Sequence, residues 1–211
     1  MDKKQILNAL GKCLEDKGKR RFTQSVELIL NFKGIDFTKP ENRLNMDLTL
    51  PKGRGKELKV AVFGDGQLSF DAKKAGADLV IGGDEIPKLA SDPSKIKALA
   101  KTHEFLAEPK LMMVVGKHLG KFLGKAGKLP KPIMDVPVAD AIMQARNKVR
   151  LSSKGKYLPV LQCLVGKEDM PVDQLADNVD AVYERVKEKI PDYNIHSVYV
   201  KLSMGKAVRV V

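Results

Sequence analysis

The stretch TQSVELILNF, residues 23–32, decides the fold class of the part of the chain in which it lies. Its apolar residues Val26, Leu28, Leu30 and Phe32 fall at every second position, which is the period of a β-strand. Most of the positions between them are polar. The stretch therefore predicts a half-buried strand of the antiparallel kind.

The two ends of the chain share this style. The same alternation predicts strands at 43–50, 157–165, 195–202 and 207–211. Apolar residues at helical spacing predict one helix near each end, over 2–16 and 171–190. Both ends thus combine antiparallel strands with a helix, as in an α+β domain.

The middle of the chain has a different pattern. Short, solidly apolar runs predict strands at 58–63, 78–81 and 111–115, and helices are predicted over 69–75, 89–100 and 138–149. Continuous apolar strands between helices are typical of a parallel sheet that is covered on both faces. The middle therefore predicts a small three-layer α/β domain.

These patterns predict a two-domain protein with α/β and α+β parts. A discontinuous α+β domain takes residues 1–53 and 151–211, and the α/β domain is inserted between them at 54–150. The turn-forming, charged run PKGRGK at 51–56 interrupts every pattern and suggests the first boundary.

Charge indicates the class of partner. The chain has 211 residues, 38 Lys and Arg against 26 Asp and Glu, and a net charge of +12. Polyanions are the natural partners of such a surface, with nucleic acid first and an anionic membrane surface second. The apolar runs are far shorter than the roughly 20 residues of a spanning helix, and no leader pattern opens the chain. We expect a cytoplasmic protein without a membrane segment.

No spacing typical of catalysis or metal binding is found. Cys13 and Cys163 do not have the CxxC spacing of a metal-ligand pair, and the three histidines are isolated in sequence from one another and from the cysteines. The run Gly64-Asp65-Gly66 lacks the third glycine of a dinucleotide fingerprint, and no Gly-Lys pair is followed by the Ser or Thr of a P-loop. We expect no enzyme, no catalytic residue, no metal and no cofactor.

Two alternatives stay open from the residues alone. A small-molecule enzyme could use the α/β domain, because such folds hold ligands at the carboxyl ends of their strands. A nonspecific DNA-binding protein would also fit the charge, but it would show no preference for folded RNA.

Two basic clusters belong to the predicted α+β domain. The run KRRF at 19–22 leads into the first strand with an aromatic residue at its threshold. Near the other end, Ser203-Met204-Gly205 predicts a turn between two strands, flanked by Lys201 and Lys206. An exposed methionine beside basic residues fits a surface that packs on sugars or bases.

A third cluster is the segment GKHLGKFLGKAGK at 116–128. Lys117, Lys121 and Lys125 recur every four residues, so a helix would place them on one face. The repeated glycines weaken such a helix and let a partner approach its backbone. A solvated basic face and contact with phosphates are both open readings.

Eight short motifs occur along the chain. They are RFTQSVE at 21–27, LPKGRGK at 50–56, AGAD at 75–78, GGDE at 82–85, LGKFLG at 119–124, LADN at 175–178, SVYV at 197–200 and SMG at 203–205. Taken together and in order, these motifs are similar to those of the large-subunit ribosomal protein L-one family in its archaeal-type version. The resemblance implies a first domain made from both termini and an inserted Rossmann-like domain.

The resemblance also implies a function. Members bind large-subunit rRNA, form the mobile stalk beside the ribosomal exit site, assist release of deacylated tRNA, and repress translation by binding their own mRNA. The implied partners are therefore large-subunit rRNA, its own mRNA, exit-site tRNA and the ribosome, with no membrane and with a monomer when free.

The resemblance carries over site residues. The RNA-binding residues of the family correspond here to Arg21, Phe22, Ser25, Glu27, Ser197, Ser203, Met204 and Gly205. Lys201 and Lys206 are expected to add attraction for phosphates, and Lys117, Lys121, Lys125 and Lys128 to form a secondary RNA contact. Serine replaces the more common threonine at 25 and 203, which keeps the hydroxyl group.

Overall fold

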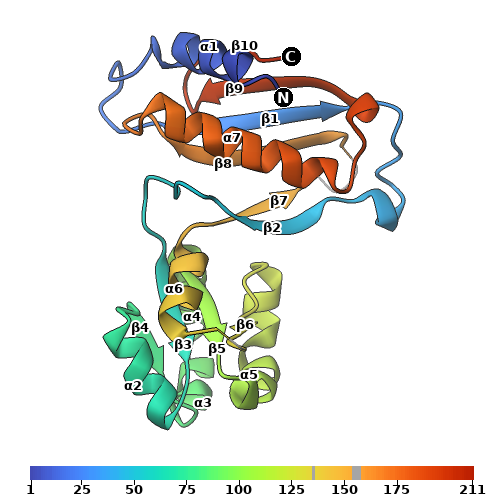
Figure 1. Cartoon of the computed structure of the whole chain (residues 1–211). Coiled ribbons are helices and arrows are strands. Elements are labelled where there is room, and N and C mark those ends of the chain that lie inside the picture. Colours follow the sequence, from blue (N-terminus) through green and yellow to red (C-terminus); the bar gives the residue numbers. More distant parts are fainter. Residues whose placement is uncertain (135, 154–157) are drawn as a thin grey trace. The chain divides into compact units, whose positions relative to one another are not determined.

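The chain divides into two compact units. The computed structural model describes residues 1–134, 136–153 and 158–211. Unit 1 consists of Met1–Lys56 and Asn147–Val211, and unit 2 of Glu57–Arg146. Both ends of the chain lie in unit 1 (Figure 1). These boundaries fall at 56/57 and 146/147, a few residues from the predicted 53/54 and 150/151.

The second boundary differs because the prediction of a helix over 138–149 was wrong at its end. Helix α6 is Val138–Arg146, and strand β7 begins at once as Lys148–Ser152. Within β7, buried Val149 and Leu151 alternate with more exposed neighbours, which is strand spacing. The strand pairs antiparallel with β2, Asn45–Thr49, and so belongs to unit 1.

Unit 1 is built on an antiparallel sheet with the strand order β10-β9-β1-β8. Its strands are β1 (Ser25–Phe32), β8 (Val160–Lys167), β9 (Ile195–Leu202) and β10 (Val208–Arg209). The predicted strands at 23–32, 195–202 and 207–211 are confirmed, the last in shorter form. The strand predicted over 157–165 is β8, and its first predicted residue, Tyr157, lies outside the described residues.

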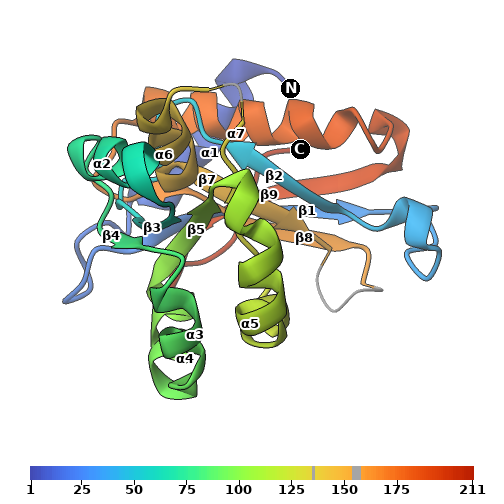
Figure 2. The ribbon, with the colours of Figure 1, turned by 90° about the horizontal axis from the view of Figure 1, so that it is seen from below.

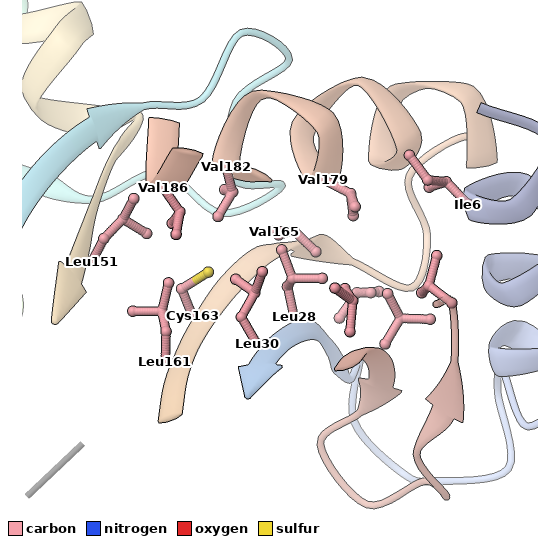
Figure 3. Close-up of a cluster of buried hydrophobic side chains, with 14 of the residues drawn as sticks. Ile6, Leu28, Leu30, Leu151, Leu161, Cys163, Val165, Val179, Val182 and Val186 are labelled. Carbon is pink, nitrogen blue, oxygen red and sulfur yellow. The ribbon is translucent and has the colours of Figure 1, made fainter. Parts of the chain in front are cut away.

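Both long helices of unit 1 pack on one face of this sheet. They are α1 (Lys3–Leu14) and α7 (Val172–Lys187), as the amphipathic patterns predicted. Figure 3 shows Val179, Val182 and Val186 of α7 pointing toward Leu28 and Leu30 of β1. The alternate residues of β1 point to the opposite face and are only half-buried. Two short 3-10 turns complete the unit, Pro40–Asn42 and Asp192–Asn194.

A buried asparagine joins two of the sequence motifs. Asn178 on α7 is fully buried, and its Oδ1 accepts from the backbone N–H of Lys52 at 3.0 Å. Its Nδ2 donates to the carbonyls of Gly53 at 2.9 Å and of Val165 at 2.8 Å. One side chain therefore fixes the loop after β2 to both α7 and β8.

Unit 2 is a three-layer α/β unit, as predicted. Its parallel sheet has the order β4-β3-β5-β6, with β3 (Lys59–Phe63), β4 (Leu79–Ile81), β5 (His103–Ala107) and β6 (Lys131–Pro132). Helices α2 (Gly66–Lys74) and α6 pack on the face that carries Val60 and Val62. Helices α3 (Glu85–Ala90), α4 (Pro93–Thr102) and α5 (Met112–Lys125) pack on the face that carries Ala61 and Phe63 (Figure 2).

The strand predicted at 111–115 is wrong. A 3-10 turn at Pro109–Leu111 leads into α5, and the third strand is β5 instead. The run LMMVV is solidly apolar, but its buried residues Leu111 and Val115 continue to Leu119 and Leu123 at four-residue spacing. That spacing belongs to a helix, so the longer period decides the structure.

The helix predicted over 89–100 is two helices. Pro93 starts α4, and the side chain of Asp92 accepts from the N–H of Lys95 at 3.2 Å. A proline at the first turn and an aspartate as N-cap are strong signals for a new helix.

The buried His103 at the start of β5 predicts a pH dependence of unit 2. Burial lowers its pKa below the ordinary 6.5, and the nearby Asp78 opposes that effect only in part. Below pH 6.5 the unfolded chain therefore binds more protons than the folded chain, so stability should fall as the pH drops. His103→Gln should remove this contribution. Hydrogen exchange of peptides from β3 and β5 gives the stability of unit 2 in the wild type and in His103→Gln. If the difference in stability between the two proteins stays constant from pH 7.5 to 5, His103 is not the cause of the pH dependence.

Candidate nucleic-acid interface

Most RNA-binding residues predicted in unit 1 gather at one end of the four-stranded sheet. The loop 15–24 leads into β1 there, and β9 ends there in the turn 203–205 (Figure 1). The backbone N–H of Ser203 donates to the carbonyl of Ser25 at 3.0 Å, which joins the two strand ends. The turn itself is closed by Gly205 N–H donating to the carbonyl of Leu202 at 2.9 Å. We call this region the turn end of the sheet.

The buried side chain of Gln24 holds the turn in place. Its Oε1 accepts from the N–H of Met204 at 3.0 Å, and its Nε2 donates to Oε2 of Glu168 at 3.3 Å. The carbonyl of Gln24 in turn accepts from the N–H of Glu168 at 3.1 Å. Because Gln24 is 1% exposed and Glu168 is 5% exposed, water cannot easily replace these bonds. The position of Met204 is therefore fixed from beneath.

Neither Gln24 nor Glu168 was predicted as a site residue. Gln24 lies inside the motif RFTQSVE, which is the only signal in the sequence for it. Its function depends on Met204 and Glu168, which are distant in sequence and meet only in the folded chain.

The hydroxyl groups of the two serines at the turn end have different hydrogen-bond partners. Ser203 Oγ lies 3.2 Å from Glu27 Oε1 and 3.3 Å from the carbonyl of Ser25, and its single proton can serve either acceptor. Ser25 Oγ accepts from Lys167 Nζ at 2.9 Å. A lysine can only donate, so the proton of Ser25 remains available to an outside acceptor, while Ser203 keeps lone pairs for an outside donor.

Apolar and basic groups surround these hydroxyls. Phe22 and Met204 are 54% and 59% exposed, which is unusual for large apolar side chains. Arg21 and Lys206 are exposed, and Lys201 lies directly across from Glu27 in the strand pair. Such an arrangement can attract phosphates while the apolar groups pack on sugars or bases.

Ser197 is not part of this end. It lies near the opposite end of β9, about 20 Å from Ser203 by the rise of a strand. It is 4% exposed, and its Oγ accepts from Asn31 Nδ2 at 3.0 Å. The structure therefore brings the predicted set together at the turn end with the exception of Ser197.

The predicted secondary contact lies in unit 2. Lys117, Lys121 and Lys125 are exposed on α5, while Leu119 and Leu123 of the same helix are buried. The prediction that a helix places these three lysines on one face is thus confirmed. Lys128 follows the helix, is half-buried and forms an ion pair with Glu104.

Unit 2 also contains the cavity that an α/β enzyme would use. It has a volume of about 580 Å³ and lies at the carboxyl ends of β3 and β5, lined in part by Asp65, Asp71 and Glu108. Asp65 Oδ1 accepts from Gly83 N–H at 2.8 Å, and Glu108 Oε2 accepts from Asp65 N–H at 3.3 Å. Asp65 and Glu108 therefore brace the loops. The three carboxylates outnumber Lys110, the lysine that also lines the cavity, so the cavity would repel the phosphates of a nucleotide. The geometry does not favour the enzyme alternative.

Nucleophilic thiols and metal-binding clusters are also disfavoured as the basis of a catalytic site. Burial raises the pKa of the Cys13 thiol to about 11 and that of Cys163 to about 12, so both are protonated at neutral pH and are poor nucleophiles. Within residues 1–134, 136–153 and 158–211, no three His, Cys, Asp or Glu side chains are grouped so that they could hold a metal ion. In the same ranges, no helix combines the length and apolarity needed to span a bilayer.

Comparison with known proteins points to one family. The model of the ribosomal protein L1p/L10e family matches residues 13–206. The large ribosomal subunit protein uL1 of Thermofilum pendens is 45% identical over 195 residues, which cover 91% of this chain and 86% of the relative. Its counterparts from Methanothermobacter thermautotrophicus and Methanocella arvoryzae are 40% and 39% identical and cover 98% and 100% of this chain, with 99% and 100% of their own lengths matched.

Proposed function

Because the chain belongs to the ribosomal protein L1p/L10e family, it is a structural, non-enzymatic protein of the large ribosomal subunit that binds rRNA, and we propose that the turn end of the sheet makes that contact. Its place of action is the ribosome in the cytoplasm.

The observation that carries this proposal is the fixed turn with an exposed methionine. Gln24 holds the backbone of Met204 in place, while the Met204 side chain is 59% exposed. A preorganised apolar group loses little conformational entropy when it packs on a partner. The exposure is therefore best explained by a surface that covers it in the ribosome.

The polar groups of the turn end suit RNA in particular. The free proton of Ser25 and the lone pairs of Ser203 can pair with 2′-hydroxyl groups, which DNA lacks. The carboxylate of Glu27 would repel phosphates, but its contact with the Ser203 hydroxyl gives it a positioning role. Arg21, Lys201 and Lys206 supply the attraction for phosphates that is common to all nucleic acids.

The test is a comparison of two ligands. The purified chain is titrated with a large-subunit rRNA fragment that carries the stalk and with a duplex DNA of equal length, each over a salt series. We expect tight RNA binding at salt concentrations that abolish DNA binding, because charge contacts weaken with salt and specific contacts less so. Equal affinities that fall together with salt would reduce the interaction to charge and remove the turn end from the proposal.

Met204→Ala should weaken RNA binding without destabilising the fold. The side chain is mostly exposed, so the free energy of unfolding should change by less than about 0.5 kcal/mol. Loss of its packing on a base or sugar should lower the affinity for the rRNA fragment by about 5- to 50-fold, by analogy with stacking residues. Met143→Ala, at an exposed methionine of α6, is the matched control and should bind as the wild type does. Equal affinities of the two variants would place Met204 outside the interface.

The resemblance supports finer proposals. The chain would form the mobile stalk beside the exit site, assist release of deacylated tRNA, and repress its own translation by binding its mRNA. If rRNA and mRNA use the same turn end, the leader of that mRNA should compete with the rRNA fragment, and Met204→Ala should weaken both. Simultaneous binding of both RNAs to one chain would contradict a shared surface. Gel filtration of the free chain tests the proposed monomer.

A further inference from the structure

The turn that follows β8 supports the residues that lead into β1. This turn spans residues 167–170, and the N–H of Met170 closes it by donating to the carbonyl of Lys167 at 3.1 Å. The side chains of its first two residues bond to each residue from 23 to 25. We call residues 167–170 the support turn. The start of β1 therefore depends on a segment that is distant in sequence.

Lys167 holds its ammonium group against two neutral oxygen atoms. Its Nζ donates to Ser25 Oγ at 2.9 Å and to the carbonyl of Thr23 at 3.3 Å. The side chain is half-buried, and it forms no ion pair with any carboxylate in the described part of the chain. Both of its partners are uncharged, so this lysine does not serve as a counter-ion within unit 1. It serves as a donor that cannot accept a hydrogen bond.

The aliphatic stem of Lys167 is held by a close approach of Gly55. This glycine has a φ of 69° and belongs to the motif LPKGRGK. A Cβ atom at Gly55 would lie 2.9 Å from Cβ and Cγ of Lys167 and 2.8 Å from Sδ of Met170, which is closer than side chains pack. Asn178 fixes the loop that carries Gly55. The stem therefore has little room to move, and its ammonium group stays directed at Ser25.

We infer that Lys167 is a positioning residue of the RNA-binding site, which fixes the Ser25 hydroxyl as a donor toward the RNA. The inference rests on the proposed rRNA-binding function and names what that site requires of its partner. Because Ser25 Oγ accepts from Lys167, its own proton points elsewhere. No group that the structure describes accepts this proton. Position 25 then selects an acceptor of the RNA, such as a phosphate oxygen or a base carbonyl.

A direct phosphate contact by Lys167 is the competing role. An ammonium group has three N–H donors, and the two bonds to Thr23 and Ser25 leave one. In that role the lysine would add one charge contact and would act independently of Ser25. The two roles differ in the salt dependence of binding and in their dependence on the Ser25 hydroxyl.

The first experiment removes the ammonium group in the full chain. Lys167→Met should lower the affinity for the rRNA fragment that carries the stalk by about tenfold, because a charged hydrogen bond no longer orients Ser25. The slope of affinity against salt should stay that of the wild type. A slope lowered by roughly 0.7 to 0.9, the value for one phosphate, would overturn the positioning role.

Lys189→Met is the matched control for this experiment. Lys189 also belongs to unit 1 and donates to a neutral group, the carbonyl of Arg43 at 2.5 Å, but it lies before the start of β9, away from the turn end. This variant should bind as the wild type does. Urea unfolding of each variant checks the fold. If Lys167→Met does not fold, Lys167→Gln replaces it, because its amide can still bond to Thr23 and Ser25.

A double-mutant cycle tests whether Lys167 acts through Ser25. In the background of Ser25→Ala, Lys167→Met should lower the rRNA affinity by less than about threefold, since the hydroxyl that it orients is already absent. Two losses that multiply would mean that Lys167 and Ser25 act separately, which contradicts the inference.

Gly55→Ala tests the position of the stem without changing Lys167. The added methyl group should displace the stem, and the affinity for the rRNA fragment should fall at least threefold below that of Gly34→Ala. Gly34 has nearly the same φ, 68°, and its Cβ would meet only the side chain of Asn194 at 3.3 Å, so the two variants share the backbone strain. Equal affinities of the two variants would show that the close approach of Gly55 does not matter for binding.

The outcomes separate this inference from the proposed function. If Lys167→Met binds as Lys189→Met does while Met204→Ala binds weakly, Lys167 has no part in the site, although the proposed function stands. If the wild-type chain does not prefer the rRNA fragment over duplex DNA, the proposed function itself fails, and the inference fails with it.

Discussion

Asn178→Ala should lower the free energy of unfolding of unit 1 by about 3 kcal/mol, the largest effect that we expect from removing a single side chain outside the apolar core. The side chain makes three hydrogen bonds to backbone groups, and all three would be lost. The carbonyl of Val165 is buried on β8 and would be left without this donor. An unpaired buried carbonyl is costly, so the loss should exceed that of three exposed hydrogen bonds.

The tyrosines make this effect measurable. The chain has no tryptophan, and its four tyrosines, at 157, 183, 193 and 199, all belong to unit 1. Urea unfolding followed by tyrosine fluorescence therefore reports on unit 1 alone. Gln174→Ala, at an exposed position of the same helix, is the control and should leave the unfolding midpoint nearly unchanged. A loss below about 1 kcal/mol in Asn178→Ala would mean that water replaces the side chain.

The sequence was informative about unit 1 where one period continued over several residues. The alternation in 23–32 and the helical spacing in 171–190 both correspond to observed elements. The sequence was misleading where a short apolar run fitted both the two-residue period of a strand and the longer period of a helix. Residues 111–115 are apolar in every register, and only Leu119 and Leu123 beyond the window show that they belong to a helix. Residues 147–149 were assigned to the preceding helix because the partner strand β2 is far away in sequence.

The candidate site shows the same limit. Exposed residues such as Phe22 and Met204 could be identified because a resemblance names their positions. Gln24 and Glu168 could not, because a supporting hydrogen bond joins segments that only the fold brings together. Ser197 shows the converse, since a matching motif position is buried and bonded to Asn31.

Gln24→Glu should give the second large effect, and this effect should depend on pH. Glutamate has the shape of glutamine and can still accept from the N–H of Met204, but it replaces the donor that faces Glu168 at 3.3 Å. Two buried carboxylates at that distance repel each other strongly, so the folded variant keeps a proton between them up to a higher pH than two exposed carboxyl groups would. The unfolded chain releases this proton above a pH of about 4.3.

The sign of the effect follows from this uptake of a proton. The folded variant binds more protons than the unfolded variant, so its stability relative to the wild type should fall as the pH rises, by up to about 1.4 kcal/mol per pH unit. We expect near wild-type stability at pH 5 and a loss of about 3 kcal/mol at pH 7. Gln24→Ala removes both hydrogen bonds without adding a carboxyl group. Its loss of stability should therefore be similar at pH 5 and at pH 7. Gln174→Glu adds the same charge at an exposed position of unit 1 and should have little effect at any pH.

The same variant connects the stability of the turn end with its binding. At pH 5 the protonated pair can hold the turn as Gln24 does, so Gln24→Glu should bind the rRNA fragment within about twofold of the wild type measured at the same pH. At pH 8 repulsion between the two carboxylates of Gln24→Glu should displace Met204. Binding of the rRNA fragment by this variant should then weaken when urea is added at concentrations too low to unfold the wild type. If the loss of affinity is equal at both pH values, a protonated carboxyl group does not replace the amide of Gln24. The interface would then need the amide group itself, and not only an uncharged partner for Glu168. A stability that does not change with pH would mean that Glu168 moves into solvent and does not support the turn from beneath.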